Sequence, residues 1–130
     1  MKIITTWMKN HEFESKQELN TIKLDGDKQN GFGPKALLLA GLAGCSGIDV
    51  IDILEKMKVG FSHFIIDVEA EQTEEHPKVF KDILITYRMK TAGDNEIKVK
   101  KAIELSLDKY CGVSAMLKKN SHIEYKLIIE

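Results

Sequence analysis

The stretch from Gly33 to Met57 constrains the fold more than any other part of the chain. Pro34 suits the first turn of a helix, where its missing N–H would have no intrahelical partner, and no later proline interrupts the stretch. Residues 36–48 carry no charged side chain, and apolar residues occur on every face of the predicted helix. A helix of this kind is buried on most of its sides. The sequence therefore predicts a long buried central helix around which the rest of the chain packs.

Three glycines form a strip along the predicted central helix. Gly41, Gly44 and Gly47 recur at three-residue spacing, and each costs the helix up to about 1 kcal/mol relative to alanine. A cost of this size suggests that the strip allows a close approach by another element. We expect either a sheet or a second copy of the same helix to pack there.

Short strands and a second helix surround the central helix. The predicted strands cover residues 2–8, 12–16, 21–24, 61–71, 79–89 and 123–129. The first three form an antiparallel meander, and the next two form a hairpin. In the strand 79–89 the alternation places Val79, Ile83, Ile85 and Tyr87 on one face. The second helix follows Gly93–Asn95, is interrupted at Cys111–Gly112 and continues as a short piece over 113–119. The order β-β-β-α-β-β-α-β predicts an α+β fold in a single domain, residues 1–130, with helices stacked on one side of a sheet. Four aromatic residues of the strands are predicted to lie in the core: Trp7, Phe61, Phe64 and Tyr87.

The charge balance and the N-terminus exclude several classes of protein. Nineteen basic and twenty acidic side chains give a net charge of −1, which leaves no basic surface for nucleic acid or an anionic membrane. The N-terminal residues lack the uninterrupted apolar segment of an export signal, and the charge-free run 36–48 is shorter than the ~20 residues of a membrane span. We therefore expect a cytoplasmic protein without nucleic-acid or membrane partners, whose two cysteines are free rather than a structural disulfide.

The residues alone leave the role of the two cysteines open. Cys45 lies inside the predicted core helix, where free cysteine is commonly a small buried hydrophobe. Cys111 lies at the break before a short helix, and a helix N-terminus lowers the pKa of a thiol, although a packed thiol is an equal alternative. The four histidines have no ligand-like spacing, so no metal site is predicted. Asp49, Asp52 and Glu55 lie about one turn apart and are interpreted as the solvated end of the helix, without a role.

Two segments around the cysteines resemble motifs of the OsmC/Ohr family, the osmotically induced and organic hydroperoxide resistance proteins, in its OsmC-like, YhfA-type subgroup. The first is GPKALLLAGLAGCSGIDV at residues 33–50, and the second is AIELSLDKYCGV at residues 102–113. The element order, the loop before Pro34 and the pair His76–Pro77 agree with that family across nearly the whole chain. The resemblance implies an intertwined homodimer with the two central helices at its centre. It also implies two active sites at the dimer interface, each with two cysteines from one chain.

The resemblance implies a function as well. In active members the residue matching Cys45 is the thiol that attacks the peroxide, and the residue matching Cys111 resolves the sulfenic acid to a disulfide. This predicts a thiol-dependent peroxidase that reduces organic hydroperoxides, draws on a dithiol reductant and needs no cofactor. Two positions depart from the pattern of active members. Lys35 stands where they have glutamate, and the only arginine, Arg88, lies in the second hairpin rather than in the N-terminal strands.

Lys35 is accordingly a candidate auxiliary residue that supplies positive charge near Cys45. The missing arginine and glutamate favour an alternative, a catalytically weak OsmC-like protein that acts as a redox-responsive dimer or binds a small apolar ligand. A third interpretation is a structural dimer with inert core thiols. The presence of both cysteines favours the peroxidase over the catalytically weak protein, whereas thiols that are unreactive in the folded state would favour the structural dimer.

Overall fold

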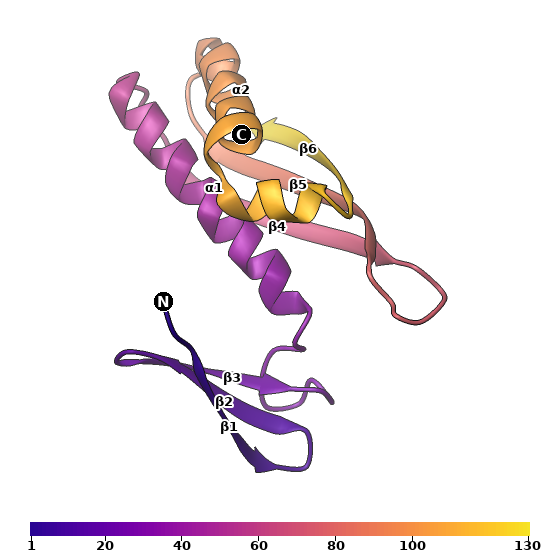
Figure 1. Ribbon diagram of the computed structural model, residues 1–130. Helices are drawn as coiled ribbons and strands as arrows, with labels where there is room; N and C mark the ends of the chain where they lie inside the picture. The colour runs from indigo at the N-terminus through magenta and orange to yellow at the C-terminus, as the bar shows by residue number, and fades with distance from the viewer. The chain divides into compact units, whose positions relative to one another are not determined.

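The computed structural model describes residues 1–130 and divides them into two compact units, Met1–Leu39 and Ala40–Glu130. The strands are β1 (Ile4–Lys9), β2 (Glu12–Gln17), β3 (Asn20–Asp25), β4 (Ser62–Gln72), β5 (Phe80–Lys90) and β6 (His122–Ile129). The helices are α1 (Ala36–Lys56), η1 (Gly93–Asn95), α2 (Glu96–Leu105), η2 (Ser106–Tyr110) and α3 (Gly112–Lys118). This order confirms the predicted β-β-β-α-β-β-α-β arrangement and the α+β class, and Figure 1 labels the six strands with α1 and α2.

The strands form two three-stranded sheets instead of the single sheet that the element order suggested. In the first unit β1, β2 and β3 form the expected antiparallel meander. Trp7 lies opposite Phe13, which in turn lies opposite Leu24, so the three share one face of this sheet. Trp7 is 62% exposed. The prediction that Trp7 lies in the core is wrong, because three strands alone give this face no second layer.

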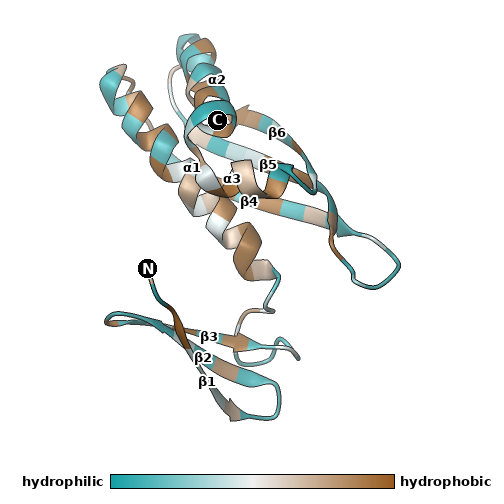
Figure 2. Ribbon diagram, in the orientation of Figure 1, coloured by the Kyte–Doolittle hydropathy of each residue, from teal (hydrophilic) through white to brown (hydrophobic).

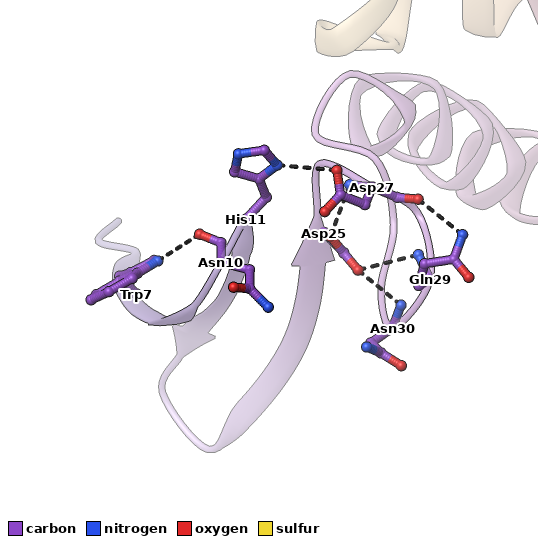
Figure 3. A network of polar contacts seen from close by, with 7 residues as sticks. All are labelled: Trp7, Asn10, His11, Asp25, Asp27, Gln29 and Asn30. Atoms are coloured by element: carbon purple, nitrogen blue, oxygen red, sulfur yellow. Dashed lines mark hydrogen bonds and ion pairs between the residues drawn. The ribbon is translucent and has the colours of Figure 1, made fainter.

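A loop stabilised by one carboxylate joins β3 to α1 (Figure 3). The side chain of Asp25 accepts hydrogen bonds from three backbone N–H groups of the loop: those of Asp27 at 2.8 Å, Gln29 at 3.2 Å and Asn30 at 3.0 Å. These bonds lower the pKa of Asp25. His11 also contacts the loop, with its Nδ1 3.1 Å from Asp27 Oδ1. The turn-forming composition of this stretch therefore produces a defined loop that ends where α1 begins.

In the second unit β5 is the central strand of the sheet, antiparallel to β4 and parallel to β6. A parallel pair needs a crossover connection, and η1, α2, η2 and α3 provide it. Alternate residues of β5 are buried and form much of the core: Ile83, Ile85, Tyr87 and Met89. The alternation predicted for residues 79–89 is confirmed for the first three of these, whereas Phe80 rather than Val79 is buried at the start of the strand.

Helix α1 packs on the sheet of the second unit along one strip of its surface. The buried residues of α1 are Leu42, Ser46, Gly47, Val50 and Leu54. A Cβ at Gly47 would lie 2.9 Å from Ile66 Cδ1 on β4, which confirms the predicted close approach of a sheet at this glycine. At Gly41 and Gly44 no atom of the chain lies within 4 Å of such a Cβ. The close approach predicted at these two glycines is therefore not found within the second unit.

The prediction that α1 is buried on most sides is wrong for the single chain. Ile48 is 63% exposed, and Leu38 and Ile51 are also exposed. Figure 2 shows the apolar colouring that runs along much of α1. One chain supplies only one layer against this helix, so the remaining apolar residues stay on the surface. By length and composition the whole 21-residue helix is sufficient to cross a membrane, although the charge-free run alone is not. In the fold Leu42, Val50 and Leu54 are fully buried instead.

Candidate active site

The two cysteines lie on different elements of the second unit. Cys45 is half-buried on α1, next to the fully buried Ser46. Cys111 is 3% exposed and follows η2, a π-helical turn that ends α2. The interruption predicted at Cys111–Gly112 is confirmed, because the backbone of Cys111 is extended and α3 begins at the next residue. A π-helical turn inside a helix is frequent at functional sites.

The fold brings the two thiols together. Both cysteines are free, and the Cys45 side chain is near enough to Cys111 to affect the pKa of its thiol. Burial raises the pKa of the Cys111 thiol, and the neighbouring Cys45 raises it further. The backbone N–H of Ser114 donates to Cys111 Sγ at 3.3 Å and acts in the opposite direction. The expectation that the helix N-terminus lowers the pKa of Cys111 is therefore wrong in its net sign, because burial has the larger effect.

A buried polar network lies beside the thiols and joins three elements. Ser46 Oγ on α1 is 2.6 Å from the Tyr87 hydroxyl on β5. The hydroxyl of Ser106, the first residue of η2, lies 3.0 Å from Ser46 Oγ and 3.0 Å from Asp49 Oδ2. Burial raises the pKa of Tyr87 to about 12, the bond to Ser46 opposes this, and Cys111 and Asp49 add smaller increases. The Tyr87 phenol is therefore neutral at physiological pH.

Asp49 is a member of this network, so the interpretation that it belongs to the solvated end of the helix is wrong. Its carboxylate accepts the hydroxyl of Ser106, 57 residues away in the sequence. Asp52 and Glu55 are exposed, as expected for the solvated end of a helix. A local signal for Asp49 was present, because a residue three positions after Ser46 and four after Cys45 lies on the same side of a helix. The partner on η2 could not be identified from spacing.

The backbone around Cys111 is fixed by several hydrogen bonds. The Cys111 N–H donates to the Ser106 carbonyl at 2.7 Å, across the π-helical turn. The Ser114 hydroxyl donates to the carbonyl of Leu107 at 3.1 Å and to that of Cys111 at 3.0 Å. The Lys118 ammonium also donates to the Leu107 carbonyl. These bonds hold the segment that carries the second thiol.

Of the two basic residues discussed for the site, the structure places Arg88 away from the thiols. Arg88 forms an ion pair with Asp67 on β4, and because it follows the core residue Tyr87 on β5 it points to the opposite face of the sheet. Lys35 is exposed and belongs to the first unit, directly before α1, and its auxiliary role stays a prediction. The fold gathers no group of three or more His, Cys, Asp or Glu side chains that is suited to a metal ion.

Comparisons with known proteins show strong similarity over the region that contains both cysteines. A family model described as OsmC-like protein matches residues 25–126. Protein YhfA of Escherichia coli (strain K12) is 32% identical over 105 residues, which cover 80% of this chain and 78% of YhfA. The crystal structure of a hypothetical protein from Aquifex aeolicus VF5 has a TM-score of 0.84 at 29% identity, covering 99% of this chain and 96% of that one. The organic hydroperoxide resistance protein OhrB of Bacillus subtilis has a TM-score of 0.67 at 17% identity, with 97% and 96% covered.

Proposed function

This chain belongs to the OsmC-like family, and we propose that it is a thiol-dependent peroxidase that reduces organic hydroperoxides. In this proposal Cys45 attacks the peroxide and Cys111 resolves the product. The observation that carries the proposal is the meeting of two free thiols from α1 and the end of η2. The name of OhrB, which shares the fold, supports organic hydroperoxides as the class of substrate.

The different exposure of the two cysteines supports the order of the two steps. Cys45 is half-buried and accessible to a small substrate, whereas Cys111 is almost fully buried and its raised pKa keeps the thiol protonated. The Cys45 thiolate attacks one peroxide oxygen, an S–O bond forms as the O–O bond breaks, and the alcohol leaves with a proton. Cys111 then attacks the sulfur of the sulfenic acid. The disulfide forms and one water molecule leaves with the Cys111 proton.

The proposal includes a dithiol reductant that returns both cysteines to thiols. The reductant reduces the Cys45–Cys111 disulfide by thiol–disulfide exchange and is itself oxidised to a disulfide. A cytoplasmic location suits this cycle, because thiol systems keep that compartment reducing. Lys35 is proposed to supply positive charge near the Cys45 thiolate, in the place of the arginine of active relatives.

We also propose that the working form is an intertwined homodimer, as the family resemblance implies. Two surfaces of the single chain support a partner. A Cβ built at Gly44 on α1 meets nothing within 4 Å, and Ile48 on the same helix is exposed. The N-terminal sheet exposes Trp7 and Ile22 on the same face. Large exposed apolar surfaces of this kind are typical of protein interfaces.

The second candidate function is a catalytically weak dimer that responds to redox conditions or binds a small apolar ligand. It is favoured by the position of Arg88, whose ion pair with Asp67 lies on the face of the sheet opposite Tyr87. For this candidate function we expect the thiol pair to form a disulfide slowly, with no preference for a particular peroxide.

The experiment that tests the proposal follows the loss of free thiols when reduced protein meets one equivalent of an organic hydroperoxide, with hydrogen peroxide in parallel. We expect the loss of two thiols per chain, faster with the organic peroxide. Cys45→Ser should abolish the reaction, and Cys111→Ser should leave a sulfenic acid that a dimedone-type reagent traps. The urea-unfolded chain is the control for intrinsic thiol reactivity. A loss no faster in the folded protein than in this control would exclude the peroxidase and favour the second candidate.

A further inference from the structure

We propose that Asp49 and Ser106 are positioning residues for the disulfide step. Their hydrogen bond holds the π-helical turn η2 against α1, so that the Cys111 thiol stays within reach of Cys45. The inference rests on the proposed function for the roles of the two thiols, and it adds a structural reason why they can combine.

The first link connects η2 to the helix that carries Cys45. Ser106 is fully buried, and its hydroxyl lies 3.0 Å from Asp49 Oδ2. Asp49 follows Cys45 by four residues on α1, so both side chains lie on the same side of that helix. A hydrogen bond to an ionised carboxylate is roughly twice as strong as a bond between neutral groups. The Asp49 carboxylate is therefore the strongest acceptor that α1 offers to η2.

The second link connects Ser106 to Cys111. The Ser106 carbonyl accepts the Cys111 N–H at 2.7 Å, five residues along the chain. The side chain of Ser106 is thus bound to α1 while its backbone is bound to Cys111. Two consecutive hydrogen bonds lead from Asp49 to the backbone of the second cysteine. The Ser114 hydroxyl, bonded to the Cys111 carbonyl at 3.0 Å, fixes the other side of the same residue.

The geometry of a disulfide explains why this fixation matters. The two sulfur atoms must come to about 2.05 Å, and the two Cα atoms to about 4.4–6.8 Å, in a restricted range of dihedral angles. A turn that moves freely presents the second thiol in this geometry only part of the time. Holding the turn in the reduced protein raises the effective concentration of one thiol at the other.

The network also includes Ser46, which limits the consequences of removing one bond. Ser46 Oγ lies 3.0 Å from the Ser106 hydroxyl and 2.6 Å from that of Tyr87. In Asp49→Ala the Ser106 hydroxyl therefore keeps one buried partner, and the core loses no apolar volume. We expect this variant to fold. Asp49→Asn keeps an oxygen acceptor for Ser106 without the charge, and this conservative variant should restore about half of the effect.

The test measures the equilibrium between the Cys45–Cys111 disulfide and a glutathione redox buffer in the full-length protein. It needs no peroxide. We expect the disulfide to be about tenfold less favoured in Ser106→Ala and Asp49→Ala, which is roughly the weight of one hydrogen bond to a charged group. Tenfold corresponds to a reduction potential about 30 mV less negative for a two-electron couple. Asp49→Asn should lie between the wild type and Asp49→Ala, because its amide oxygen is a weaker, neutral acceptor. Asp52→Ala, which removes an exposed carboxylate from the same helix, is the matched control and should not change the potential.

A second arm separates this inference from the proposed function. After a pulse of organic hydroperoxide, Ser106→Ala should form its sulfenic acid as fast as the wild type and convert it to the disulfide more slowly. If no protein reacts with peroxide but the glutathione equilibrium shifts as expected, the peroxidase proposal fails and the positioning role stands. Equal potentials for Ser106→Ala, Asp49→Ala and Asp52→Ala would overturn the positioning role. So would the failure of the wild type to form the disulfide at all.

Discussion

Replacing Tyr87 with phenylalanine removes one hydroxyl group from a fully buried position and leaves the ring in place. Ser46 loses a partner at 2.6 Å but keeps Ser106 at 3.0 Å, so no buried hydroxyl is left without a hydrogen bond. A hydrogen bond of this kind contributes about 0.5–1.5 kcal/mol net. We therefore expect the free energy of unfolding of Tyr87→Phe to be lower than that of the wild type by about this amount near neutral pH.

The same hydroxyl makes the difference between the two proteins depend on pH. Burial raises the pKa of Tyr87 to about 12 in the folded state, compared with about 10 in an unfolded chain. Because the folded state holds the phenol proton more tightly, this contribution to stability is complete below about pH 10 and is lost as the pH rises through about 12. At about pH 11 the loss in the wild type amounts to about 1.4 kcal/mol. The variant has no phenol at this position and does not lose it.

Urea unfolding at about pH 8 and about pH 11, under reducing conditions and at one protein concentration, measures this difference. The advantage of the wild type over Tyr87→Phe should disappear or reverse at the higher pH. Tyr110→Phe is the matched control, because Tyr110 at the end of η2 is exposed and has no bond to Ser46. If the difference between wild type and Tyr87→Phe is the same at both pH values, the buried neutral phenol is not a property of this fold.

Two further perturbations address the dimer and the N-terminal loop. Gly44→Leu adds a side chain at a position where a Cβ meets nothing within 4 Å, so we expect it to dissociate the proposed dimer in analytical ultracentrifugation. Gly93→Leu, at an equally open glycine, is the control and should leave the dimer intact. A Gly44→Leu protein that is still dimeric would argue against helix packing at this strip. Asp25→Ala removes the acceptor of three loop N–H groups, so their hydrogen exchange should accelerate. Because the pKa of Asp25 is lowered below its usual 3.8, these N–H groups of the wild type should stay protected from exchange above about pH 4 and lose their protection as the pH falls further. Equal exchange rates in the wild type and Asp25→Ala would contradict this role of Asp25.

Local patterns in the sequence predicted the elements but not their partners. The alternation of Ile83, Ile85 and Tyr87 identified the buried face of β5, since a strand needs only its own residues to display a period of two. The helix break at Cys111 was likewise visible from composition. The parallel pairing of β6 with β5 and the exposure of Trp7 depend on which layers the rest of the chain supplies. These features could not be obtained from the strands alone.

The candidate site also combines features that local sequence patterns predict with features that depend on distant residues. The family motifs identified Cys45 and Cys111, and the fold brings them together. The bond between Ser106 and Asp49 joins residues far apart in the sequence, and neither residue carries a local signal for the other. The direction of the Cys111 pKa shift also required the structure, because burial of the thiol is set by distant residues and outweighs the adjacent helix terminus.

A newly synthesised chain carries Trp7, Ile22 and Ile48 on its surface. In the proposed dimer these residues become buried only when a second chain arrives, so the stability of the native state rises with the concentration of the protein itself. At low expression a larger share of chains would remain unassembled and available to proteases and chaperones. The apolar surface of α1 and of the N-terminal sheet would thus make the cellular lifetime of the protein depend on its own abundance.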